Sequence, residues 1–90
     1  MRSSTARSFW KCFDALPQDA QKLAFKSYRL WRENPGHPGL HFKPVHPTLP
    51  VYSVRISAGL RAVGVKTVDD TIVWYWIGTH AEYARLIRGL

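Results

Sequence analysis

The hydrophobic residues in the first third of the chain recur at helical spacing. The first apolar stripe consists of Phe9, Phe13 and Leu16. This spacing predicts a short helix that ends before Pro17. A proline is well tolerated in the first turn of a helix, so Pro17 is expected to begin a second one. Its apolar stripe extends to Trp31, and Asn34-Pro35-Gly36 is expected to end it.

After Gly39 the pattern changes to one typical of strands. Residues 51–57 alternate between apolar and polar side chains, and Ala58-Gly59 is a turn signal before a returning strand. The predicted strands are residues 40–45, 51–57, 61–68 and 71–78, of which the last is strongly apolar and expected to be central. Thr79 with Glu82 matches a capping box, which predicts a short final helix.

Two helices followed by a run of strands indicate the α+β class. We expect an N-terminal helical hairpin packed on one face of a three- to four-stranded antiparallel sheet, with a short C-terminal helix. The other sheet face is expected to be concave and basic. The length corresponds to a single domain over residues 1–90, with residues 1–7 expected to be flexible.

The composition limits the kinds of partner. Thirteen Lys and Arg against six Asp and Glu give a net charge of +7, which favours an anionic partner: nucleic acid, an acidic protein or a membrane surface. The basic residues are spread along the chain rather than clustered, so a membrane partner is not expected. Cys12 is the only cysteine, which excludes an internal disulfide. With no apolar leader or membrane span, the expected location is the cytoplasm.

Two arginines flank the predicted hairpin turn. A three-residue loop would place Arg55 and Arg61 on one face of the hairpin, whereas a two-residue loop would place them on opposite faces. The sequence leaves both registers open. If Arg55 and Arg61 share one face, their guanidinium groups can bind a phosphate group through bidentate hydrogen bonds. The alternative is an ordinary solvated strand face.

The last strand leads directly into His80, and a histidine can donate or accept a proton near neutral pH. The alternative for His80 is a packed or surface histidine. Tyr83, three residues later, faces the same side of the final helix and can stack on a base or donate a hydrogen bond. Lys43 is a candidate for an additional phosphate contact. The three remaining histidines match no zinc spacing, so we expect no metal site; they are His37, His41 and His46.

Four short motifs extend this pattern through the chain. They are FK at 42–43, YSVRI at 52–56, GLRAV at 59–63 and WIGTHAEY at 76–83. In their order and spacing they resemble the RelE/ParE superfamily of bacterial toxins over residues 9–88. The resemblance implies a RelE-like fold and a toxin of a type II toxin–antitoxin pair.

RelE-like members of that superfamily are metal-free endoribonucleases that cut mRNA in the ribosomal decoding site. The resemblance implies a catalytic set of His80, Arg61, Arg55 and Tyr83, and RNA binding by Lys43, Arg55 and Arg61. It implies no cofactor, and as partners a cognate antitoxin, mRNA and the ribosome. Where RelE has two lysines on the first hairpin strand, this chain has Ser53 and Arg55. Arginine stays protonated and is a poor base, so proton transfer is assigned to His80.

Two alternatives to the nuclease remain open at this stage. ParE-type members of the same superfamily inhibit DNA gyrase by binding, a function that needs no His80. A non-catalytic interaction module is the other alternative.

Overall fold

A computed structural model describes all 90 residues. The regular elements are, in chain order, β1 (Arg2–Thr5), α1 (Arg7–Asp14), α2 (Gln18–Glu33), the 3₁₀ turn η1 (Pro38–Leu40), β2 (Lys43–Pro44), β3 (Val51–Ser57), β4 (Leu60–Lys66), β5 (Thr71–Thr79) and α3 (His80–Arg88). The α+β class, the helical hairpin and the C-terminal helix are confirmed. No helix combines the length and the apolar character needed to span a lipid bilayer.

The sheet differs from the prediction in its number of strands and their direction. It has five strands in the order β1-β5-β4-β3-β2. Strand β1 pairs in parallel with β5, from Arg2 opposite Thr71 to Thr5 opposite Trp74, while the other pairs are antiparallel. The expectation of an antiparallel sheet of three or four strands is therefore wrong in this detail. Strand β1 lies within residues 1–7, where no regular structure was expected. Strand β5 is interior, as predicted.

The predicted strand at residues 40–45 is largely replaced by a tight turn. Leu40 is buried and ends η1, and only Lys43 and Pro44 pair with β3. The His37 Nδ1 atom accepts a hydrogen bond from the Gly39 N–H at 3.1 Å, which stabilises the start of this turn. Proline lacks a backbone donor, so Pro44 limits how far the ladder can continue.

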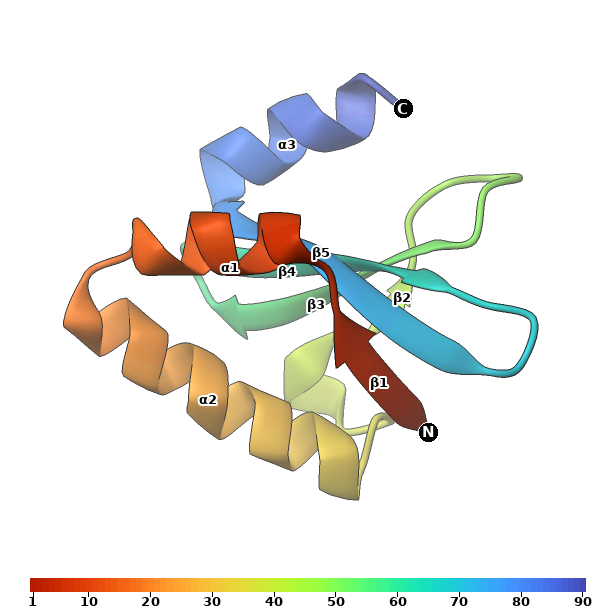
Figure 1. The fold of residues 1–90 in the computed structure, drawn as a ribbon, viewed down its shortest axis with the longest axis horizontal. Coiled ribbons are helices and arrows are strands. Elements are labelled where there is room, and N and C mark those ends of the chain that lie inside the picture. The colour runs from red at the N-terminus through yellow and green to blue at the C-terminus, as the bar shows by residue number, and fades with distance from the viewer.

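The helical hairpin α1–α2 lies on one side of the sheet (Figure 1), and the hydrophobic core lies between the two. Trp31 on α2 is 1% exposed and packs edge-on against Trp74 of β5, with ring centroids 5.3 Å apart. The buried cluster consists of Phe13, Ala24, Trp31, Leu40, Val54, Ala62, Ile72, Trp74 and Ile77. Because α1 and α2 cover this face, the opposite face is left for α3 and for the polar residues of the hairpin.

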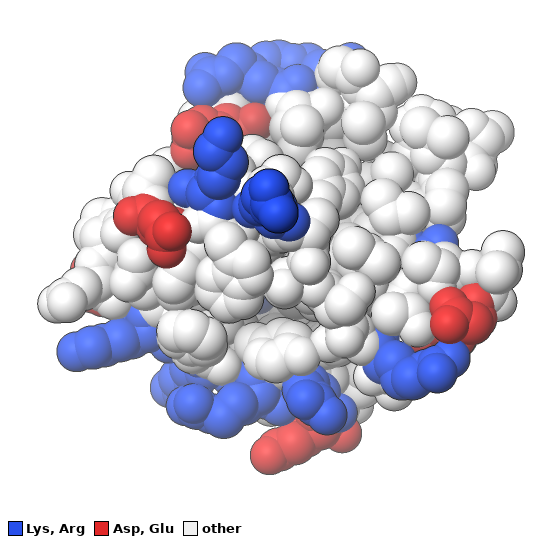
Figure 2. All heavy atoms as spheres, viewed as in Figure 1, with Lys and Arg blue, Asp and Glu red and all other residues white.

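Few of the basic side chains are neutralised within the molecule. The two ion pairs join Arg2 to Asp69 and Lys66 to Asp70, both at 3.1 Å. Figure 2 shows basic side chains over α2 at the lower edge of the view and over α3 at the upper edge. The positive charge predicted from the composition is thus spread over several sides of the surface and is available to an anionic partner.

Candidate active site

The register of the β3–β4 hairpin places the two arginines side by side. Ser57 pairs with Leu60 across the two-residue turn Ala58–Gly59. A two-residue loop was expected to separate the arginines, but a bulge between Arg55 and Ser57 inserts one extra residue in β3. The bulge restores the shared face, so Arg55 lies directly opposite Arg61. That inference from loop length was wrong because it assumed a regular ladder.

A cleft of about 140 Å³ lies on this face of the sheet. It brings together all five residues that the sequence nominated, and adds two others. Its lining residues are His41, Lys43, Ser53, Arg55, Arg61, His80 and Tyr83. Three cationic side chains, two histidines and one phenol therefore converge on a single polar hollow. A phosphate group with its neighbouring ribose is a chemically matched occupant of such a cleft.

Arg61 is held in place by the turn that precedes it. Its Nη1 atom donates to the Leu60 carbonyl at 3.0 Å and to the Ser57 carbonyl at 2.5 Å. Partial burial and, second, the charge of Arg55 hold the pKa of the Arg61 guanidinium below its usual value. A guanidinium remains charged at any accessible pH, so the two positive charges repel each other unless an anion joins them.

Replacing Arg55 by glutamine is expected to raise the thermal midpoint of unfolding at low salt. Arg55 forms no ion pair, and like charges directly opposite each other in a sheet cost about 0.2–1 kcal/mol. The gain should shrink at high salt, because added ions screen this repulsion. Thermal unfolding of wild type and Arg55→Gln at two salt concentrations checks this. A variant that is destabilised at low salt would contradict it.

His80 is the first residue of α3 and is fixed at the mouth of the hairpin. Its backbone N–H donates to the Gly59 carbonyl at 3.0 Å, which ties the start of α3 to the β3–β4 turn. Thr79 and Glu82 form the predicted capping box, with Thr79 N–H to Glu82 Oε1 at 3.0 Å and Glu82 N–H to Thr79 Oγ1 at 3.2 Å. The hydrogen bond from the Thr79 backbone lowers the pKa of Glu82. The imidazole of His80 is exposed and free of protein hydrogen bonds.

Tyr83 lies one turn along the same helix, with its ring centroid 6.0 Å from that of His80. Its hydroxyl donates to Ser53 Oγ at 3.2 Å, which anchors α3 across β3. Ser53 is 4% exposed, so this bond lies at the base of the cleft. The ring is half-buried and forms part of the cleft wall.

The chain is similar to known proteins in its structure and not in its sequence. No protein-family model matches the sequence, and no curated protein sequence matches it. Several solved structures match the structure of this chain. The RelB–RelE antitoxin–toxin complex of Methanococcus jannaschii matches with a TM-score of 0.71 at 14% identity, over 91% of this chain and 95% of that one.

Two further structures give the same result. The YoeB/ParE toxin of Agrobacterium tumefaciens has a TM-score of 0.67 at 15% identity, over 89% of this chain and 99% of that chain. The archaeal RelE–RelB complex of Pyrococcus horikoshii has a TM-score of 0.64 at 13% identity, over 87% of this chain and 92% of that one. The chain has the RelE-like toxin fold.

Within this RelE-like fold, His41 is a cleft residue that sequence reasoning did not select. It follows η1 in the left-handed backbone conformation, with φ 45° and ψ 41°. Its segment is rich in proline and glycine and has no periodicity, so nothing in the pattern indicated which way the side chain points. The feature that was present, three histidines among prolines, was considered only as a metal site, and the spacing of the histidines argued against one.

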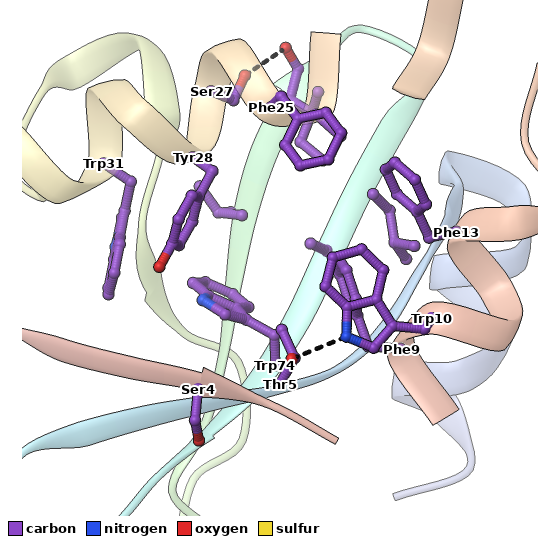
Figure 3. Close-up of a pocket in the computed structure, with 15 residues that line it drawn as sticks. Ser4, Thr5, Phe9, Trp10, Phe13, Phe25, Ser27, Tyr28, Trp31 and Trp74 are labelled. Carbon is purple, nitrogen blue, oxygen red and sulfur yellow. Dashed lines mark hydrogen bonds between the residues drawn. The ribbon is translucent and has the colours of Figure 1, made fainter. Parts of the chain in front are cut away.

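A second hollow of the RelE-like fold lies on the helical side of the sheet (Figure 3). It has a volume of about 230 Å³ and lies between α1, α2 and the sheet, with exposed Trp10 and Phe25 among its lining residues. No Lys, Arg, His, Asp or Glu lines it. It offers apolar surface but no charged or imidazole side chain, so the chemistry of the molecule is assigned to the cleft.

Proposed function

We propose that this protein is the toxin of a type II toxin–antitoxin pair and acts as an endoribonuclease on mRNA. The observation that carries the proposal is the convergence of Lys43, Arg55 and Arg61 with His80 on one cleft. Cations bind and stabilise phosphate, and a histidine can move a proton near neutral pH. The fold match to toxins of this kind supports the same function.

In the proposed reaction the ribose 2′-oxygen attacks the adjacent phosphorus. A bond forms from O2′ to phosphorus, the bond from phosphorus to O5′ breaks, and the products are a cyclic phosphate and a free 5′-hydroxyl. His80 transfers one of the protons. Arg55 and Arg61 stabilise the charge that develops on the phosphoryl oxygens, where preorganised donors are most effective. Lys43 binds a neighbouring phosphate, and Tyr83 orients or stacks on a base.

The proposed substrate is mRNA on the ribosome, which makes the cytoplasm the site of action. A ribosome that holds the RNA in a reactive geometry would supply much of the rate. The proposed regulator is a cognate antitoxin that covers the cationic cleft with acidic or apolar residues. These assignments account for the charge of +7 and for the largely unpaired basic residues.

Expression of the wild-type protein in a bacterial host, followed by mapping of RNA 5′ ends, tests the function. New ends within translated codons, carrying 5′-hydroxyl groups, are the expected result. Purified protein is assayed in parallel for inhibition of DNA gyrase. Growth arrest with DNA damage and intact mRNA would contradict the nuclease and favour gyrase inhibition by binding. Growth without arrest would contradict both toxin functions.

A further inference from the structure

We propose that His41 is a second catalytic residue of the cleft and moves the proton that His80 does not move. This inference rests on the proposed ribonuclease function and specifies its chemistry. It assigns the cleft one histidine as the base that takes the 2′-hydroxyl proton and one as the acid that protonates the leaving O5′ atom.

The reaction itself requires two proton transfers at different places. The attacking and leaving oxygens lie on opposite sides of the phosphorus in an in-line displacement. One imidazole cannot reach both sides in a single step. The arginines cannot supply the second transfer, because a guanidinium does not give up its proton at accessible pH. If His80 were the only histidine of the cleft, one of the two oxygens would have no imidazole partner.

The four histidines of the chain divide into two pairs by what their rings do. His37 Nδ1 accepts from the Gly39 N–H at 3.1 Å, and His46 Nδ1 accepts from the Thr48 and Leu49 N–H groups at 3.1 and 2.9 Å. These two rings hold loops together. The rings of His41 and His80 form no hydrogen bond with the protein, and both are exposed residues that line the cleft.

His41 and His80 enter the cleft from different parts of the fold. His41 follows η1, just before β2, and His80 begins α3 at the end of β5. Two independent segments thus each present an unengaged imidazole to the hollow that also contains Arg55 and Arg61. In-line transfer needs two proton-transfer groups, and the cleft contains two histidines that are free to serve.

The backbone of His41 is in the left-handed conformation, with a φ of 45° at the end of a helical turn. Glycine and asparagine are the most usual residues there, and histidine is among the few other types that are enriched in it. The His41 N–H donates to the Pro38 carbonyl at 3.3 Å, so the turn fixes this conformation whatever the side chain is. This backbone conformation therefore sets where the His41 side chain lies, which is in the lining of the cleft.

Lys43 is the rival for the second proton, because it lines the same cleft and an ammonium group can act as an acid. Arginine at position 43 keeps the positive charge but cannot transfer a proton. The comparison of Lys43→Arg with His41→Asn therefore separates the two candidates. The proposal predicts the larger loss of cleavage rate for His41→Asn.

The first experiment measures cleavage of mRNA on bacterial ribosomes by His41→Asn and His41→Gly. Both replacements suit the left-handed conformation, so the midpoint of unfolding should stay the same or rise. The cleavage rate should nevertheless fall by about 10²–10⁴-fold. Added imidazole should restore part of the activity of His41→Gly, which a structural role would not allow. His37→Asn is the matched control, since asparagine can also accept the Gly39 N–H, and it should keep wild-type activity.

The second experiment uses mRNA with sulfur in place of the bridging O5′ at the cleavage site. A thiolate leaves without protonation, so this substrate should rescue the variant that lacks the acid but not the variant that lacks the base. We expect rescue of one of His41→Asn and His80→Asn and not of the other.

Three results would overturn the assignment of His41. They are cleavage by His41→Asn within about threefold of wild type, a larger loss in Lys43→Arg, and rescue of neither histidine variant by the sulfur substrate. In each case wild type would still cleave mRNA. Wild-type protein that does not cleave at all would instead refute the proposed function, so the two failures are distinguishable.

Discussion

The His80→Ala variant is expected to cleave ribosome-bound mRNA about 10²–10⁴-fold more slowly than wild type. The reason is that the arginines of the cleft can stabilise a charged transition state but cannot move a proton. The loss should appear in kcat rather than in KM, since Lys43, Arg55 and Arg61 still bind the phosphates. Single-turnover cleavage at saturating protein measures it directly.

The same variant should fold like wild type. The His80 side chain is exposed and forms no hydrogen bond, and its structural bond to Gly59 uses the backbone N–H, which alanine retains. Equal unfolding midpoints would therefore separate lost chemistry from lost structure. Full growth arrest by His80→Ala would contradict a proton-transfer role and indicate inhibition by binding.

The Gly64→Ala variant is expected to lose about 1–3 kcal/mol of unfolding free energy, as for an overpacked core. A Cβ atom at Gly64 would lie 2.7 Å from Ile72 Cγ2 and 2.9 Å from Trp74 Cε3. Both neighbours are buried, at 0% and 4% exposed, and neither can move without disturbing the core. For a domain of this size each kcal/mol lowers the Tm by about 4–8 °C. Urea and thermal unfolding check the loss.

Gly59→Ala is the matched control for this prediction. A Cβ atom at Gly59 would have no neighbour within 4 Å, and neither glycine has a positive φ. Both substitutions reduce the freedom of the unfolded chain equally, so the difference between them isolates the clash in the core. Equal midpoints for Gly59→Ala and Gly64→Ala would contradict the packing argument.

The elements with a strong periodic pattern were predictable from the sequence. The hydrophobic stripe and its two proline boundaries placed the second helix within one residue of Gln18–Glu33. The alternation at residues 51–57 matches β3, and the capping box at Thr79 forms as expected. These features are local, so neighbouring residues alone encode them. The five nominated site residues also converge, because they lie on adjacent strands and at the end of β5.

What the sequence did not reveal depends on distant partners or on irregular backbone. Strand β1 is four mostly exposed residues without alternation, and it is a strand only because β5 lies beside it. The bulge at Ile56 leaves the apolar alternation of 52, 54 and 56 intact, so no pattern marks it. His41 points into the cleft because of one left-handed residue in a loop. Each is a tertiary property rather than a periodic one.

The parallel pairing of β1 with β5 also constrains the order in which the protein assembles. Arg2 pairs with Thr71, so β1, which is synthesised first, cannot pair until β5 has also been synthesised. The β3–β4 hairpin, with short sequence separation, can form early, whereas contacts between distant residues slow folding. A nascent chain on the ribosome can therefore complete neither its sheet nor the His80 side of its cleft until nearly the whole chain has emerged. Because the cleft includes His80 and Tyr83 near the C-terminus, it can be complete only when synthesis is almost finished.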